Sequence, residues 1–78
     1  MPSYEQFLKD VKASLKKGLA CYEISDQELD DYLKSEENQV LGEYKDLLAS
    51  DEENEGLSQD AIYKAAVSSI AYCLEMCY

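Results

Sequence analysis

Apolar residues recur at steps of three and four along almost the whole chain of 78 residues. This spacing places them on one side of a helix that has 3.6 residues per turn. The sequence lacks the strict alternation that is typical of a half-buried strand, and no turn dipeptide separates two apolar runs. The pattern therefore predicts an all-α fold, a small compact bundle of three to four helices that forms a single domain over residues 1–78.

Serines in capping positions divide the chain into helical segments. Ser3 precedes Gln6 by three residues and Ser25 precedes Glu28 by the same interval, which is the spacing of a capping box. Ser58 stands at the start of the last apolar run and is expected to cap it in the same way. The expected helices cover approximately residues 4–20, 26–34, 36–49 and 58–77.

The middle of the chain allows two interpretations. The apolar positions of residues 26–49 run in phase, so periodicity alone permits one long helix. Ser35 is followed by Glu36 and Glu37, which resembles a new N-cap with acidic residues in its first turn. We favour two helices with a break at Ser35. Gly18 is expected to end the first helix in a left-handed conformation.

The last segment, residues 58–77, has the widest apolar face. Eight residues share about half of its circumference, namely Ile62, Tyr63, Ala66, Val67, Ile70, Cys73, Leu74 and Cys77. We expect this segment to be the hydrophobic spine that the three preceding helices cover, with Ala61 and Ala71 on the solvent side. Tyr72 and Tyr78 fall near the edges of the face and are expected to remain as exposed apolar surface.

The charge is strongly negative and unevenly distributed. The formal net charge is −10, and residues 23–60 carry fourteen acidic residues against two lysines. Such a chain repels phosphate backbones and anionic lipid surfaces, so we expect it to bind neither nucleic acid directly nor membranes. Lys9, Lys12 and Lys16 in the first helix are expected to offset part of the negative charge of the middle segment.

The two ends of the chain indicate a cytoplasmic protein. The N-terminal residues lack the charged and apolar regions of a secretory signal, and the number of cysteines is odd, which is typical of reduced thiols. The apolar C-terminal stretch of eighteen residues contains Lys64 and Glu75, and it is too short and too interrupted to cross a bilayer of about 30 Å.

Two features could indicate a metal site. Cys73 and Cys77 lie one helical turn apart, but the chain has no histidine and only one further cysteine, Cys21. We therefore expect both thiols to be small apolar residues of the core face. In the acidic stretch 50–56, an EF-hand loop would begin at Asp51, with Glu53, Glu55 and Gly56 in its third, fifth and sixth positions, yet its twelfth position is Ile62 instead of glutamate. We expect a solvated acidic loop, no metal ion and no cofactor, although ion binding by the acidic side chains remains an alternative.

Catalysis finds little support in the sequence. The length, acidity and predicted helices resemble those of acyl carrier proteins, which carry an Asp-Ser-Leu motif at the head of the second helix. That tripeptide is absent here, so the chain is not assigned to this family. Histidine, the usual general acid or base, is also absent, and the C-terminal cysteines lie on an apolar face with only Glu75 close in sequence as a base. We expect a protein that is not an enzyme.

The remaining features favour a small non-catalytic module for protein–protein interaction or regulation. Tyr72 and Tyr78 would contact an apolar protein partner or a second copy in a homodimer, while the acidic helices would contact a basic partner. The alternative is an acidic mimic of nucleic acid that inhibits a DNA- or RNA-binding protein. Four acidic residues would carry this mimicry: Asp26, Asp30, Glu37 and Glu43. A third hypothesis is a metal or redox protein that uses Cys73 and Cys77.

Overall fold

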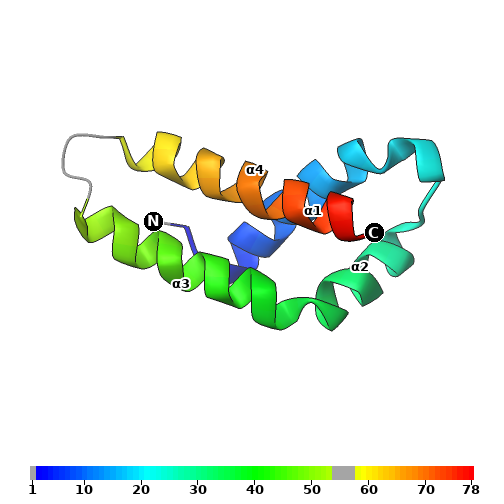
Figure 1. Cartoon of the computed structure of the whole chain (residues 1–78), viewed down its shortest axis with the longest axis horizontal. Helices are drawn as coiled ribbons and strands as arrows, with labels where there is room; N and C mark the ends of the chain where they lie inside the picture. Colours follow the sequence, from blue (N-terminus) through cyan, green and yellow to red (C-terminus); the bar gives the residue numbers. More distant parts are fainter. Residues whose placement is uncertain (1, 54–57) are drawn as a thin grey trace.

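The computed structural model describes residues 2–53 and 58–78, and this part of the chain is helical with no strand. The helices are α1 (Tyr4–Gly18), α2 (Asp26–Ser35), α3 (Glu37–Glu53) and α4 (Gln59–Cys77), and a short 3₁₀ helix, η1 (Ala20–Tyr22), follows α1. They form an elongated bundle of 40 × 21 × 19 Å in which α3 and α4 run in opposite directions (Figure 1). The predicted all-α bundle is confirmed, and α2 and α3 are separate helices.

Three of the helices begin where the sequence predicted. Ser3, Ser25 and Ser58 each accept a hydrogen bond at the side-chain oxygen from the backbone N–H three residues later, at 3.3, 3.2 and 3.1 Å. Each serine thereby satisfies one of the backbone donors that have no partner inside the helix. These caps fix the starts of α1, α2 and α4.

The break between α2 and α3 differs in detail from the prediction. Ser35 does not cap α3, because its hydroxyl donates to the carbonyl of Tyr32 at 2.7 Å and belongs to the last turn of α2. Glu36 is the junction residue, and its carbonyl accepts hydrogen bonds from the N–H groups of Gln39 and Val40. The chain therefore turns at Glu36, one residue after the expected cap.

The end of α1 also corrects a prediction. Gly18 is the last residue of the helix, but no glycine in the described ranges has a positive φ. The left-handed residue is Glu23, with a φ of 52°, because the chain continues into η1 before it turns towards α2. The missing side chain of Gly18 has a different effect: a Cβ atom there would overlap the carboxylate of Glu75 in α4.

The third helix is longer than predicted. It extends to Glu53, so the first part of the acidic stretch 50–56 is helical instead of a loop. Glutamate and aspartate allow a helix to continue, and no glycine or proline lies between the predicted end at residue 49 and Gly56. Residues 54–57 and the hypothesis of an ion site at 51–55 lie outside what the structure describes.

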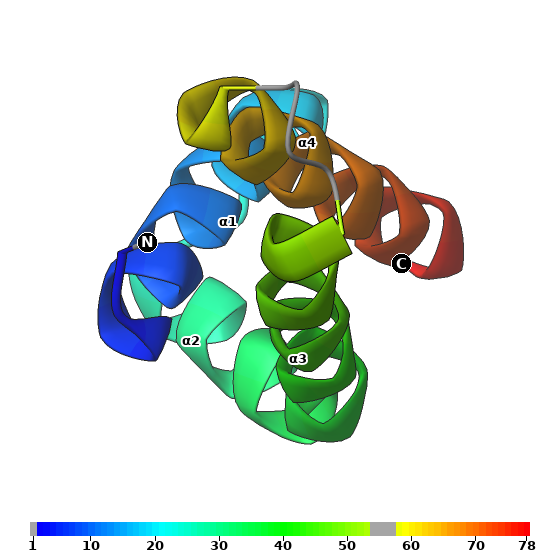
Figure 2. The same cartoon turned by 90° about the vertical axis from the view of Figure 1, so that its left-hand side faces the viewer.

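All four helices contribute side chains to one core. Its buried residues are Phe7, Val11, Leu15, Leu19, Leu29, Leu33, Val40, Leu47, Tyr63, Val67, Ile70, Ala71 and Leu74. Helix α4 supplies five of them, which fits the predicted hydrophobic spine, and α1 packs against every other helix. In the end-on view α4 lies beside α1 and α3, with α2 across the core from it (Figure 2).

The buried face of α4 is rotated relative to the prediction. Tyr63, Val67, Ile70 and Leu74 are buried as expected, and so is Ala71, which the sequence had placed on the solvent side. By contrast, the side chains of two predicted core residues are exposed: Cys73 and Cys77. The physical reason is that only α1 and α3, and not α2, pack along α4, so two helices cover a face that three were expected to cover.

Candidate protein-interaction surface

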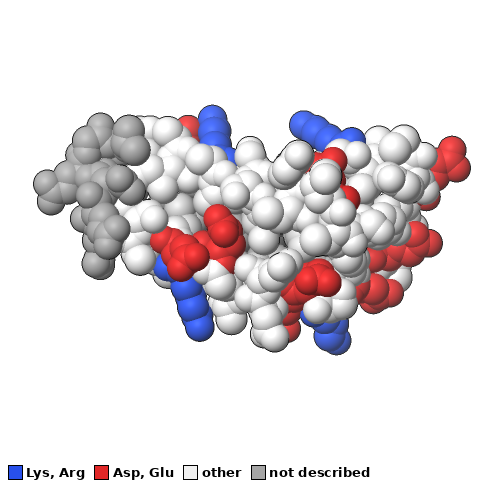
Figure 3. Space-filling model, viewed as in Figure 1, with Lys and Arg blue, Asp and Glu red and all other residues white. Residues whose placement is uncertain are grey.

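One side of α4 is left uncovered by the other helices. Seven exposed residues lie on it, and none is charged: Ala61, Ala65, Ser68, Ser69, Tyr72, Cys73 and Met76. We call this surface the α4 face. Its residues follow steps of three and four, so they form a strip along the helix. The surface over α4 is mostly white in Figure 3, whereas acidic atoms gather over α3 and α2.

The side chains of the α4 face become larger from the start of the helix to its end. Its first half consists of alanines and serines, whereas its second half carries Tyr72 and Met76, which are 63% and 71% exposed. Large apolar side chains that are this exposed and share one strip are typical of a contact surface, whereas single exposed apolar residues are ordinary.

The charged residues of α4 lie beside this face. Lys64 pairs with Asp60 at 3.1 Å, and both line a pocket together with Asp10 of α1. The carboxylate of Glu75 lies against Gly18 of α1. Lys64 and Glu75 therefore flank the α4 face along the same edge, the one that borders α1.

A cluster of three tyrosines surrounds the C-terminal end of α4. Tyr78 packs edge-on against Tyr22 and Tyr32, with ring centroids 5.7 and 5.1 Å apart. The Tyr32 hydroxyl donates to the carbonyl of Leu74 at 2.7 Å, one of the last four carbonyls of α4, which have no partner inside the helix. Tyr78 is 51% exposed and Tyr72 is also exposed, so both are accessible, and their role in partner binding stays a prediction.

The three thiols are accessible instead of buried. Cys21, Cys73 and Cys77 are free and exposed. Within residues 2–53 and 58–78, no three side chains of histidine, cysteine, aspartate or glutamate are grouped as the ligands of a metal ion would be.

The four acidic residues proposed for nucleic-acid mimicry are in different settings. Asp26 pairs with Lys16 and Asp30 with Lys12, each at 2.8 Å, so the lysines of α1 do offset part of the charge of α2. The hydrogen bond from Lys16 lowers the pKa of Asp26, and the one to Asp30 raises the pKa of Lys12. Glu37 and Glu43 lie on α3 and make no such pair with α1 in the described chain.

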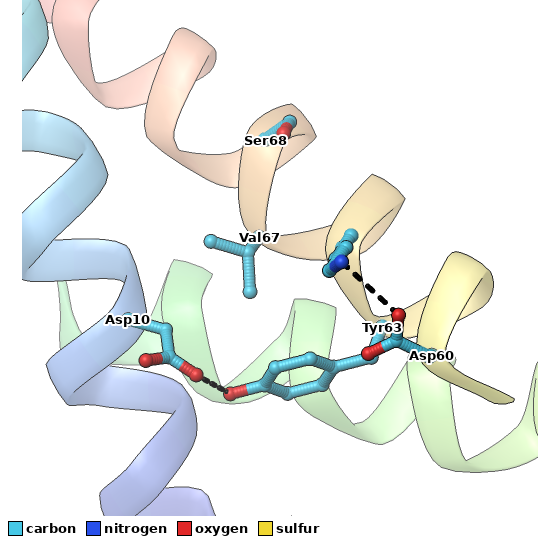
Figure 4. Close-up of a pocket in the computed structure, with 6 residues that line it drawn as sticks. Asp10, Asp60, Tyr63, Val67 and Ser68 are labelled. Carbon is cyan, nitrogen blue, oxygen red and sulfur yellow. Dashed lines mark hydrogen bonds and ion pairs between the residues drawn. The ribbon is translucent and has the colours of Figure 1, made fainter.

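A pocket between α1 and α4 holds the most perturbed side chain. Tyr63 and Asp10 both line this pocket, and the Tyr63 hydroxyl donates a hydrogen bond to the Asp10 carboxylate (Figure 4). Burial, and next the hydrogen bond to Asp10, raise the pKa of Tyr63 well above its ordinary value. The pocket is open and measures about 470 Å³. A phenol held protonated in this way can donate a hydrogen bond but is a poor base. The hydrogen bond between Tyr63 and Asp10 therefore connects α4 to α1.

Sequence reasoning did not identify the Asp10–Tyr63 pair, because the two residues are 53 positions apart. The sequence did contain one indication that Tyr63 has a polar partner. Its hydroxyl lies on an apolar stripe, and a buried tyrosine usually hydrogen-bonds to a polar group.

No described helix has the length and apolar character required to cross a bilayer. Comparisons with protein-family models, with curated proteins and with solved structures find no match for this chain.

Proposed function

We propose that this chain is a small non-catalytic interaction module that binds a partner protein through the α4 face. The observation that carries the proposal is the exposure of Tyr72 and Met76 on one uncharged strip of a protein with a net charge of −10. Burying an unpaired charge in an interface is costly, and interface cores are depleted of charged residues. The α4 face is therefore the surface on which a partner meets the lowest desolvation cost.

The partner surface should be apolar at its centre. Tyr72 offers a rigid ring with a polar tip, which suits a site that is partly dry and partly wet. Met76 has a flexible side chain that adapts to an irregular surface. The three free thiols support a cytoplasmic location, because that compartment keeps thiols reduced.

The ion pairs of α2 favour this function over nucleic-acid mimicry. A mimic needs acidic groups that are free to meet a basic groove, but Asp26 and Asp30 already contact lysines of α1. A basic partner would have to compete with these lysines for the same carboxylates.

The test compares two charge insertions in affinity capture with the tagged full chain. Ala65→Glu places a carboxylate at the middle of the α4 face, and Ala13→Glu places the same group on exposed α1. A partner of the α4 face is retained by the wild type and by Ala13→Glu, is lost with Ala65→Glu, and withstands high salt. A partner that Ala65→Glu retains and high salt releases would identify an acidic binding surface and refute the proposal.

A further inference from the structure

The net charge of this chain limits the surfaces through which two copies could approach one another. Each molecule carries a net charge of −10, so most contacts between two copies bring carboxylates together. The α4 face carries no charge and is therefore a surface on which two copies can approach without placing acidic side chains directly opposite one another.

The gradation in size makes the face self-complementary when two α4 helices lie antiparallel. With Ser68 and Ser69 at the two-fold axis, Tyr72 of one copy lies opposite Ala65 of the other. In the same register Met76 lies opposite Ala61. Each large side chain then meets a small one, so the helices can approach closely and the exposed rings and thioethers become covered.

In the same register, opposite charges at the edges of the two α4 faces lie near one another. A two-fold rotation of this kind brings the α1-side edge of one α4 against the α1-side edge of the other. Lys64 and Glu75 both lie on that edge. Lys64 of one copy then falls within two residues of the level of Glu75 in the second copy, which is about 3 Å along the helix, and symmetry repeats the pair.

From these observations we infer that the α4 face binds a second copy of this chain, in an antiparallel two-fold dimer centred on Ser68 and Ser69 and flanked by two Lys64–Glu75 pairs between the copies. The inference rests on the proposed function, since it assigns the partner of the same face. It specifies a homodimer in place of an unrelated apolar protein.

The dimer is expected to be reversible. Helix α4 has 19 residues, so the contact is about 28 Å long and about 10 Å wide. Its area is below the roughly 800 Å² per partner of a standard stable interface. Salt should strengthen association, because it screens the repulsion between two molecules of the same large charge. Association with a basic partner would respond to salt in the opposite direction.

The first experiment is sedimentation equilibrium of the full chain from micromolar to millimolar concentration, at low and high sodium chloride. The wild type should show a monomer–dimer equilibrium that shifts towards dimer with salt. Ala65→Glu should weaken dimerisation by at least about tenfold, and Ala13→Glu should change it much less. Circular dichroism verifies that both variants remain helical. A wild type that stays monomeric at every concentration, or equal effects of both variants, would overturn the inference.

The second experiment tests the register by charge exchange. Lys64→Glu and Glu75→Lys each place two like charges opposite one another in their own homodimer, so each variant alone should dimerise less than the wild type. A mixture should restore association, because both edge pairs in the mixed dimer have opposite charges. Restoration in the mixture supports the antiparallel register, and no restoration contradicts it.

The two proposals can fail separately. If the wild type is monomeric but a captured protein is lost only with Ala65→Glu, the face binds a different partner and only the homodimer is wrong. If the chain dimerises and Ala65→Glu changes neither association nor capture, the α4 face is not an interface and both proposals are wrong.

Discussion

At the scale of single residues, the contact between Tyr63 and Asp10 links the two helices that share the largest interface. The Tyr63 hydroxyl is partly buried and donates to the Asp10 carboxylate, whereas the buried hydroxyl of Tyr4 has no hydrogen-bond partner in the described chain. Tyr63→Phe should lower the free energy of unfolding by about 0.5–1.5 kcal/mol, because it removes a hydrogen bond. Tyr4→Phe removes the same group without that loss and should leave stability unchanged or higher. Urea denaturation measures both, and equal losses would contradict this account.

The same hydroxyl predicts how stability responds to alkaline pH. The pKa of Tyr63 is raised in the folded protein, so folding favours the protonated phenol. This contribution is fully present below the ordinary tyrosine pKa of about 10 and is lost as the pH rises from there towards the folded-state pKa. The free energy of unfolding should therefore fall above about pH 10, and it should fall less steeply in Tyr63→Phe. Identical slopes for the two proteins would show that another group controls the alkaline transition.

Gly42 is a position at which a single substitution should stabilise the protein. It lies inside α3, and a Cβ atom built on it meets nothing within 4 Å. Gly42→Ala should raise the free energy of unfolding by about 0.5–1 kcal/mol, because alanine loses less backbone entropy on helix formation. Gly18→Ala is the informative comparison, because its methyl group would displace the Glu75 carboxylate. This substitution should therefore raise the free energy of unfolding by less than Gly42→Ala. Thermal unfolding of both variants would test the difference, and an equal gain would contradict the contact with Glu75.

At the scale of elements, the end of α4 depends on a residue from another helix. Tyr32 of α2 donates to the carbonyl of Leu74, although α2 does not otherwise pack along α4. Tyr32→Phe keeps the ring against Tyr78 but removes this bond, so the last turn of α4 should open more often. Hydrogen exchange of the amides near Tyr78 should accelerate, while exchange in the middle of α4 stays close to that of the wild type. Tyr72→Phe removes an exposed hydroxyl on the same helix and serves as the control.

The starts of the helices could be predicted from the sequence, but the orientation of α4 could not. The caps at Ser3, Ser25 and Ser58 were predictable because a cap depends on residues three positions apart, whereas the cap expected at Ser35 was wrong. The orientation of α4 was not predictable, because Cys73 and Ala71 are both small, and either can be buried or exposed. Which of them enters the core depends on whether α2 packs beside α4, and this is a property of the assembled bundle.

The candidate surface was predictable to a similar extent. Tyr72 and Tyr78 were expected to be exposed, and both are. The sequence did not predict that Tyr78 packs against Tyr22, more than fifty residues away, nor that Met76 shares the uncharged strip with Tyr72. The contact between Tyr78 and Tyr22 depends on how the helices assemble, which the periodicity of a single helix cannot determine. Met76 lies one turn after Tyr72, so its place on the strip does follow from helix periodicity once that side of α4 is known to be exposed.

At the scale of the whole molecule, two opposing electrostatic effects determine how salt acts on folding. The ion pairs from Lys12 and Lys16 connect α1 to α2, but they are solvent-exposed, and such pairs contribute little to stability. Against them stands the mutual repulsion within a folded chain whose net charge is −10. Salt screens both effects, and the repulsion involves many more charges than the two pairs. Sodium chloride should therefore raise the free energy of unfolding.

This expectation can be measured separately from dimer formation. Urea denaturation of Ala65→Glu at micromolar concentration, where the monomer should predominate, gives the effect of sodium chloride on the monomer alone. Sodium chloride should move the midpoint to higher urea. Lys16→Gln deletes one ion pair and makes the net charge more negative, so its midpoint should respond to salt more strongly than that of the parent. If salt instead lowers both midpoints, the α1–α2 ion pairs outweigh the repulsion, and the arrangement of charge in this bundle is stabilising in spite of its negative sum.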